Sequence, residues 1–254
     1  MKVALIADIH GNLTALDAAL AEIDRESPDE LICLGDVAIF GPQPNETLDR
    51  MYTRFCPMVM GNTDAWALRP RPRPVGDEES RYVNDIELWG AKKLDFAYPE
   101  YIRNFRRAIS AEMGNGLRML CYHGSPASYH DAIDETTPDD VLDGYFADYP
   151  HRVLAGGHTH VQFLRPYGDR YLLNPGSIGL PFAPKPDGSG DYNPAWAEYA
   201  MITWDGTDLD IDLRRVPYDL DALRAAVHAS DMPHADWWLK DWGRGEADAQ
   251  RLGD

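Results

Sequence analysis

The sequence predicts an α/β (α+β) protein in which two mixed β-sheets pack together and helices cover their outer faces. Over the first sixty residues, short apolar runs alternate with segments of helical periodicity, which is typical of parallel strands connected by helices. From residue 117 onward, strand-like runs follow one another with turn sequences between them. The second region is therefore expected to be rich in strands. The sequence contains no internal repeat and no low-complexity segment.

The first half of the chain is predicted to alternate strands with helices. Leu13, Leu16, Leu20 and Ile23 recur at helical spacing directly after the first apolar run, so this segment is expected to be a helix. The predicted strands span residues 2–7, 31–34 and 58–60, and the predicted helices span residues 13–23, 46–55, 81–96 and 99–110. Alternating arginine and proline at 69–74 predicts an extended loop, because proline lacks a backbone donor and restricts the residue before it.

The second half is predicted to consist mainly of strands, at residues 117–122, 152–155, 161–166, 171–174, 199–204 and 209–215. Gly168-Asp169 and Asp205-Gly206 are turn sequences and mark hairpins between consecutive strands. Two packed mixed sheets follow from this succession of strands.

The C-terminal segment from Tyr218 onward has a helical pattern and then becomes polar, with Trp237, Trp238 and Trp242. These indoles are expected to pack on the body or in a subunit contact, and a lid over a substrate site is the alternative. We therefore assign residues 1–217 to one domain, with a helical insertion at about 66–115, and residues 218–254 to a C-terminal helical tail.

The composition is that of a globular protein with an acidic surface. Of the 254 residues, 44% are hydrophobic and 26% are charged, and the formal net charge is -18. This charge disfavours binding to a long nucleic acid, whereas a small phosphorylated compound stays compatible where metal ions dominate the local field. The three cysteines, Cys33, Cys56 and Cys121, lie in apolar surroundings, which predicts core positions rather than disulfides or a thiolate metal site.

Membrane and export signals are not recognised in the sequence. The apolar run after Met1 turns acidic at Asp8 and is too short for a signal peptide, and no stretch approaches the ~20 apolar residues of a membrane span. We expect a cytoplasmic protein with no membrane partner. An oligomeric assembly is compatible with the sequence.

Seven side chains that can bind metal follow the predicted strands: Asp8, His10, Asp36, Asn62, His123, His158 and His160. The carboxyl ends of parallel strands meet at one edge of a sheet, where such proteins build their sites. Side chains two apart on an extended segment share a face, so Asp8 and His10 are expected to face one ion. Each motif alone has an ordinary explanation as a helix cap, a turn or a buried histidine. Five such motifs, each after a strand and beside a glycine, together indicate a metal site.

These motifs resemble those of the calcineurin-like metallophosphoesterases, from Met1 to about Leu180. Three segments are similar to the small prokaryotic phosphodiesterase branch: Asp8-Ile9-His10-Gly11-Asn12-Leu13, His123-Gly124-Ser125-Pro126 and Asn174-Pro175-Gly176-Ser177. The last segment is expected to be a rigid structural turn beneath the histidine loop. The resemblance implies a four-layer αββα sandwich with two divalent metal ions at one edge. It also implies that one ion is held by Asp8, His10 and His160, the other by Asn62, His123 and His158, and that Asp36 bridges them.

The resemblance and the ligand types lead to one expected function with open alternatives. Nitrogen and oxygen ligands without thiolate suit Mn, our first expectation, as well as Fe, Zn, Co or Ni. We expect a phosphoesterase that hydrolyses phosphodiesters or small phosphate esters, in which a metal-bridged hydroxide attacks phosphorus. The alternatives are a dinucleoside-polyphosphate or nucleotide phosphohydrolase and a catalytically silent scaffold of the same fold. A DNA-repair nuclease is disfavoured by the acidic charge.

One position departs from the wider family. Many members carry a histidine proton donor after the asparagine ligand, whereas this chain has Thr63, which cannot donate a proton near neutral pH. Asn62 and Asp64 are the candidate catalytic residues; Asp64 is expected to orient a ligand or a water, and a simple turn carboxylate is the alternative. Gly11 and Asn12 begin a helix whose amino end can face phosphate, so both are candidate substrate-binding residues.

Overall fold

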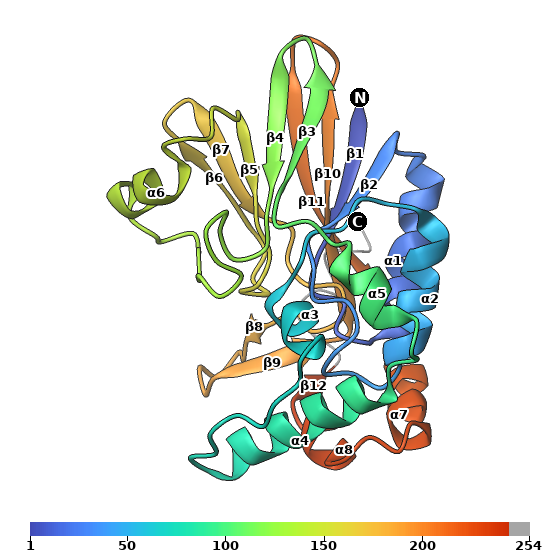
Figure 1. Cartoon of the computed structure of the whole chain (residues 1–254). Coiled ribbons are helices and arrows are strands. Elements are labelled where there is room, and N and C mark those ends of the chain that lie inside the picture. Colours follow the sequence, from blue (N-terminus) through green and yellow to red (C-terminus); the bar gives the residue numbers. More distant parts are fainter. Residues whose placement is uncertain (244–254) are drawn as a thin grey trace.

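Two β-sheets pack face to face in the computed structural model, which describes residues 1–243 (Figure 1). The first sheet contains β1 (Lys2–Ile6), β2 (Glu30–Cys33), β10 (Trp196–Trp204) and β11 (Leu209–Pro217). The second contains β3 (Ile109–Gly114), β4 (Leu117–Cys121), β5 (Val153–Ala155), β6 (Phe163–Tyr167) and β7 (Arg170–Asn174). Their strand orders are β11-β10-β1-β2 and β3-β4-β5-β7-β6. Both sheets are mixed, since β1 runs parallel to β2 but antiparallel to β10, and β4 runs parallel to β5 but antiparallel to β3.

Helices cover the outer faces of both sheets. The structure has α1 (Leu13–Glu26), α2 (Pro44–Arg54), α3 (Asn62–Ala67), α4 (Glu78–Lys93), α5 (Tyr98–Arg103), α6 (Asp139–Phe146), α7 (Leu220–Ala229) and α8 (Ala235–Leu239). Side chains alternate across β1: Ile6 packs in a core that includes α1 and α2, whereas Leu5 packs in the core between the sheets. Beyond the second sheet, Phe146 of α6 packs in a core with Leu154 and Leu172. The layers are thus α, β, β and α, and the sandwich is confirmed.

The remaining elements gather below the edge at which β1 and β2 end (Figure 1). They include a small sheet of β8 (Ala183–Pro184), β9 (Asp191–Pro194) and β12 (Trp242–Gly243), in the order β12-β9-β8. A separate apolar core joins α4, α7 and α8, with Ile86, Leu223 and Trp238 among its buried members. The predicted insertion and the predicted tail therefore pack on each other.

Three local expectations differ from the structure. The helix expected at 99–110 ends at Arg103, and β3 begins at Ile109. Burial alternates along β3, with Ala111 and Met113 buried and their neighbours exposed, so the strand period was present but overlooked. The strand expected at 58–60 makes only isolated bridges, at Met58 and Val59. Helices α3 and α6 were not predicted.

The division into domains stays a prediction. Antiparallel pairing of β10 with β1 makes the segment up to Pro217 part of the first sheet. The tail expected to be helical contains α7 and α8, but also β12, and its residues 244–254 lie outside the described part of the chain.

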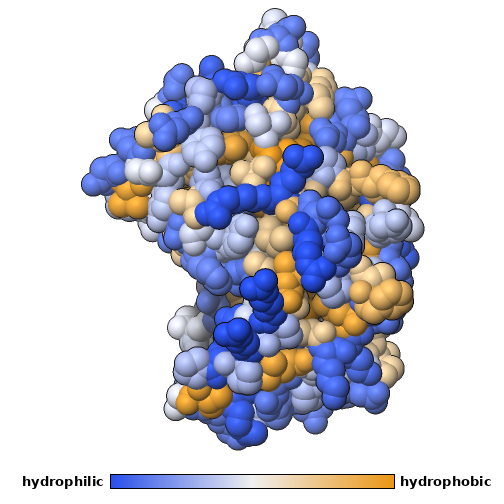
Figure 2. Space-filling model, viewed as in Figure 1, coloured by the Kyte–Doolittle hydropathy of each residue, from blue (hydrophilic) through white to orange (hydrophobic). Residues whose placement is uncertain are grey.

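The surface and the cysteines agree with the composition. Figure 2 shows a face on which hydrophilic side chains predominate and hydrophobic ones form separate patches. Cys33 and Cys121 are buried in the core and Cys56 is half-buried, and all three are free. Among residues 1–243, no helix is both long and apolar enough to cross a bilayer.

Candidate metal centre

The structure brings all seven predicted ligands to one edge of the sandwich. Asp8 and His10 follow β1, Asp36 follows β2, and Asn62 is the first residue of α3. His123 follows β4, and the pair His158 and His160 follows β5. Six of the ligands thus lie in loops at the carboxyl ends of parallel strands, and the seventh, Asn62, begins a helix. The edge is common to both sheets because β1 and β4 lie in facing layers.

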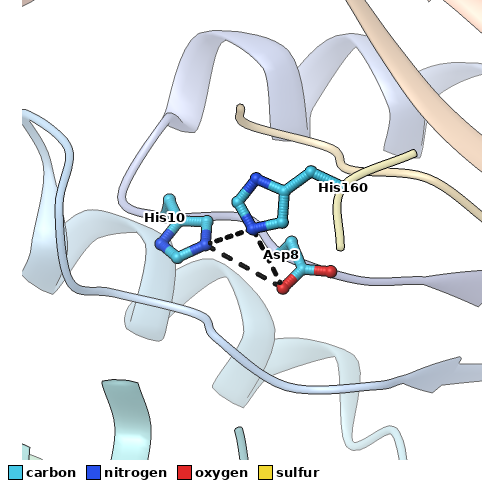
Figure 3. A group of neighbouring side chains, drawn as sticks. All are labelled: Asp8, His10 and His160. Atoms are coloured by element: carbon cyan, nitrogen blue, oxygen red, sulfur yellow. Dashed lines mark hydrogen bonds and ion pairs between the residues drawn. The ribbon is translucent and has the colours of Figure 1, made fainter. Parts of the chain in front are cut away.

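One group consists of Asp8, His10 and His160, whose side chains converge from two loops (Figure 3). The Nε2 atoms of His10 and His160 are 3.0 Å apart. Oδ1 of Asp8 lies 3.4 Å from Nε2 of His160 and 3.9 Å from Nε2 of His10. All three residues are buried, and this Asp8 oxygen has no hydrogen-bond partner among residues 1–243.

The hydrogen bonds behind these two rings determine which nitrogens face each other. Nδ1 of His10 lies 2.8 Å from the carbonyl oxygen of Ile39, and Nδ1 of His160 lies 2.8 Å from that of Leu180. A carbonyl only accepts, so each Nδ1 carries the hydrogen and each Nε2 of a neutral ring presents a lone pair. Two lone pairs at 3.0 Å repel each other unless a cation or a proton lies between them. The donor set therefore fits a metal ion.

The charges in this group explain how the metal-free chain tolerates the contact. Burial opposes the charged form of Asp8, but the neighbouring histidines, His160 foremost, hold the pKa of its carboxyl well below the usual value. Burial, followed by the charge of His160, lowers the pKa of His10. Burial also opposes protonation of His160, but Asp8 outweighs it and raises the pKa of His160. The charge of Asp8 thus favours a cation at this position, either a proton on His160 or a metal ion.

A second group is formed by Asp8, Asp36 and His123, whose ligand atoms all lie within 4.8 Å of one another. Nδ1 of His123 donates to the carbonyl oxygen of Leu34 at 2.8 Å. Its Nε2 faces Oδ1 of Asn62 at 2.9 Å, which is again a contact between two acceptors. A cation between Nε2 of His123 and Oδ1 of Asn62 removes this repulsion, as it does between His10 and His160 in the first group.

Asp36, a member of the second group, also approaches a histidine of the first, and its bridging role stays a prediction. Its Oδ2 is 3.7 Å from Nε2 of His10 and 3.6 Å from Nε2 of His123. Its Oδ1 instead accepts the backbone N–H of Thr63 at 2.8 Å. A single carboxylate oxygen of Asp36 therefore faces both His10 and His123.

His158 completes the set and is half-buried. Its ring centroid lies 5.1 Å from that of His123, and its backbone N–H donates to Oδ2 of Asp8 at 3.0 Å. Burial, followed by the charge of His123, lowers the pKa of His158, which favours the neutral form that binds metal. Its assignment to the second ion, together with Asn62, stays a prediction.

The ligand loops are held in an unusual backbone conformation. Five of the seven predicted ligands have a positive φ: Asp8 (54°), His10 (47°), Asp36 (55°), His158 (73°) and His160 (58°). Such angles are uncommon outside glycine and persist at functional sites, where the surrounding structure enforces them. The expectation of an extended Asp8-Ile9-His10 segment was therefore wrong, because the two side chains converge through left-handed residues.

The sequence and the fold are both similar to those of known proteins. The sequence profile of the calcineurin-like phosphoesterase superfamily domain matches residues 1–190. The chain belongs to this superfamily. An uncharacterized protein of Methanocaldococcus jannaschii is 28% identical over 256 residues, covering 93% of this chain and 95% of that protein.

Two solved structures show the superfamily fold over nearly the whole chain. A metallophosphoesterase from Sphaerobacter thermophilus superposes with a TM-score of 0.69 at 22% identity, covering 95% of this chain and 97% of the other. A hypothetical protein from Pyrococcus horikoshii superposes with a TM-score of 0.76 at 19% identity, covering 94% and 96%. The similarity thus includes the segment after residue 190, which lies beyond the profile match.

The carboxylate of Asp64 holds the loop that carries Asp36. Its carboxylate accepts the backbone N–H groups of Asp36 at 2.8 Å, Val37 at 3.0 Å and Gly61 at 3.0 Å. Burial, followed by the charge of Asp36, raises the pKa of Asp64 to about 7. These contacts agree with the alternative of a turn carboxylate, and they make Asp64 a positioning residue for Asp36.

The expected substrate contacts of Gly11 and Asn12 find no support in the structure. Asn12 caps α1 by accepting the N–H of Ala15 at 3.0 Å, and its amide donates to the carbonyl of Gly179 at 3.0 Å. Gly11 has a φ of 64°, and a Cβ there would lie 2.6 Å from the carbonyl oxygen of Ala38. Both residues are buried and shape the Asp8–His10 loop, and their contact with a phosphate stays a prediction.

The turn at 174–177 joins two ligand loops, which confirms its structural role. The side-chain amide of Asn174 donates to the carbonyl oxygen of Gly157 at 2.8 Å, in the histidine loop. The hydroxyl of Ser177 donates to the carbonyl oxygen of Asp8 at 2.6 Å. Two aromatic contacts to the predicted ligands were not foreseen from the sequence. Phe182 stacks on His160, and Phe40 lies edge-on to His10.

Gly61→Ala is expected to lower metal affinity by about 10- to 100-fold, as does the loss of groups that orient ligands. A Cβ on Gly61 would lie 2.0 Å from Oδ1 and 2.4 Å from the backbone nitrogen of Asp36, so Asp36 must move. Gly144→Ala is the matched control, because nothing lies within 4 Å of its Cβ and it lies in α6. Titration of each metal-free variant with Mn by calorimetry measures the effect. Equal affinities in both variants would contradict the close packing of the two loops.

Proposed function

We propose that this protein is a metal-dependent phosphoesterase that hydrolyses phosphodiesters or other small phosphate esters with two divalent metal ions. The observation that carries the proposal is the facing of acceptor atoms, at 3.0 Å between the buried His10 and His160 and at 2.9 Å between the buried His123 and the half-buried Asn62. Two facing lone pairs repel each other unless a cation or a proton lies between them. Membership of the superfamily supports the phosphoester substrate.

The residues of the chain preorganise this site. Backbone carbonyls fix the tautomers of His10, His123 and His160 before any ion binds, which lowers the reorganisation that binding requires. Oδ2 of Asp36 faces both groups while its Oδ1 is held by Thr63. Bound divalent ions supply Lewis acidity, which neutralises charge developing on the phosphoryl group and favours loss of a proton from the attacking water.

The substrate that fits this proposal is a small phosphorylated compound. A formal net charge of -18 repels the backbone of a long nucleic acid, so local attraction must come from the metal centre. Nitrogen and oxygen ligands suit Mn first, with Fe, Zn, Co or Ni as alternatives. The loops that carry the ligands contain no cysteine.

A metal-supplemented substrate screen tests the proposal. The purified protein is analysed for its metals and then assayed with bis-p-nitrophenyl phosphate, phosphomonoesters and dinucleoside polyphosphates in the presence of Mn. We expect about two metal ions per chain and turnover of at least one ester class. Two bound ions without turnover of any ester would instead favour the catalytically silent scaffold.

Thr63 leads to a prediction about leaving groups. Its hydroxyl oxygen is buried and has no hydrogen-bond partner within residues 1–243, and its side chain cannot act as an acid near neutral pH. Aryl esters are therefore expected to react far faster than alkyl esters, because the general acid help, worth ~10²–10⁴-fold, that would favour a basic leaving group is missing at this position. A series of aryl phosphodiesters with graded phenol acidity measures it. A rate nearly independent of phenol acidity would mean that another group donates the proton.

A further inference from the structure

A small aromatic pocket lies beside the metal centre. It has a volume of about 190 Å³, and four of its walls are the rings of Phe40, Phe182, Trp237 and Trp238. Leu180 adds an aliphatic side chain, and the polar part of the lining consists of Asn193, Lys240 and Asp241. The pocket is therefore mostly apolar, with few polar groups, as is usual for sites that bind a ring.

The inner wall of this pocket is shared with the metal ligands. The ring of Phe182 stacks on the imidazole of His160, with centroids 5.2 Å apart and planes 11° apart. The ring of Phe40 lies edge-on to the imidazole of His10 at 6.4 Å. The carbonyl of Leu180 accepts the hydrogen bond from Nδ1 of His160. A ligand in the pocket is thus one aromatic ring away from the predicted metal ligands.

The outer wall of the pocket is formed by Trp237 and Trp238 of α8, which pack against the rest of the protein. Nε1 of Trp238 donates to the carbonyl of Phe40 at 2.8 Å, and Trp238 packs on Trp242 with ring centroids 5.0 Å apart. Lys240 forms an ion pair with Glu79 of α4 at 2.8 Å. The ring of Trp237 lies edge-on to that of Tyr82 of α4, with centroids 5.5 Å apart. Both indoles are therefore held in place by the protein itself, which preforms the pocket.

Part of the inner wall is open to a ligand. Phe182 is 41% exposed, although its ring stacks on the imidazole of His160. A planar ring in the pocket therefore has an accessible phenyl surface to pack on. Nε1 of Trp237 has no hydrogen-bond partner in the described part of the chain, but it is buried and lies beyond the reach of an acceptor in the pocket.

We propose that this pocket binds the planar aromatic group of a phosphate ester whose phosphoryl group lies at the metal centre. The volume of about 190 Å³ is comparable to the ~150 Å³ cavity that accepts benzene and smaller than the ~300–1,000 Å³ of complete ligand sites. It therefore takes one compact ring system and leaves the phosphoryl group outside. The inference rests on the proposed function and narrows its substrates to aryl or nucleoside phosphates.

Binding to the metal-free protein tests the pocket without any turnover. The probes are phenyl phosphate, adenosine monophosphate and glycerol phosphate, measured by calorimetry and by ligand-observed NMR. At least one of the two aromatic probes should bind more tightly than glycerol phosphate. The difference between phenyl phosphate and adenosine monophosphate then shows whether the pocket prefers a simple aryl group or a nucleobase. Trp237→Ala should weaken the aromatic probe by about 3- to 10-fold, as expected for one lost aromatic contact. Phe96→Ala is the control, because Phe96 is 97% exposed and does not line this pocket.

Hydrolysis with added Mn separates failure of the pocket from failure of the proposed function. The ratio of kcat/KM for an aryl ester to that for an alkyl ester should fall about 3- to 10-fold in Trp237→Ala and stay unchanged in Phe96→Ala. Comparing variants cancels the intrinsic reactivity of the aryl leaving group. Turnover with the same ratio in all variants, and equal binding of aromatic and aliphatic probes, would overturn the pocket alone. Absence of turnover for every ester contradicts the proposed function, while tight aromatic binding still supports the pocket.

Discussion

Asp36→Asn is expected to lower kcat/KM for phosphoester hydrolysis by at least about 10³-fold. Oδ2 of Asp36 faces His10 and His123 at nearly equal distances, 3.7 Å and 3.6 Å, so its charge serves both predicted ion positions. Metal ions contribute several kcal/mol of transition-state stabilisation, and each ~1.4 kcal/mol is worth tenfold in rate. Steady-state kinetics with Mn and elemental analysis of the variant measure the two effects together.

The neighbouring residues are the controls for this variant. Asn62→Ala affects one predicted ion position only, and Asp64→Ala removes an acceptor for three backbone N–H groups without touching a ligand atom directly. Both are expected to cost less than Asp36→Asn, on the order of 10- to 100-fold. The fold should persist in Asp36→Asn, since asparagine keeps an oxygen for the N–H of Thr63. A nearly normal Asp36→Asn protein would contradict a bridging ligand at this position.

Removing the metal ions with EDTA is expected to abolish hydrolysis, and Mn, Co or Ni should restore it. The predicted ligands offer only nitrogen and oxygen atoms, and such sites exchange metals more readily than thiolate cages. Asp8 raises the pKa of His160, which favours a proton on this ring and so relieves its contact with His10 after chelation. Activity before chelation, after dialysis and after addition of each metal is the measurement. Full activity in a protein shown by elemental analysis to be metal-free would end the two-metal hypothesis.

Thermal unfolding gives a readout of the same metals that does not depend on catalysis. A ligand that binds only the folded state, at 100 times its Kd, stabilises a protein by ~2.7 kcal/mol. For a chain of this size, that corresponds to a rise in Tm of roughly 5–10 °C. The His10→Ala variant should show a smaller rise, because it loses one ligand of the first group. An identical rise in both proteins would place the metal elsewhere.

Much of the fold was readable from periodicity and turns. The helix predicted from Leu13 extends to Glu26, and the strands expected in the second half are present within a few residues. The predicted secondary structure is wrong at two segments. At Ile109 the alternation of a half-buried strand was overlooked in a segment taken as helical, and at Met58 the apolar run makes only an isolated bridge.

The sequence alone determined which residues form the candidate centre. Each ligand motif is local: a polar residue follows an apolar strand, and parallel strands bring their carboxyl ends to a common edge. Seven ligands could therefore be predicted without knowing how the two sheets pack. For Gly11 and Asn12 the sequence shows a helix start but not that both residues are buried, so their role toward a substrate stays a prediction.

Only the tertiary structure decided the geometry of the centre and what lies beside it. The facing of His10 and His160 joins residues 150 positions apart, and the positive φ angles that aim them are enforced by surrounding contacts. The aromatic pocket likewise combines Phe40, Phe182 and Trp237 from three distant segments. Local patterns specify which side chains emerge at an edge, but the distances between them depend on packing across the whole chain. For that reason the ligands were predictable, whereas the shared oxygen of Asp36 and the pocket at His160 were not.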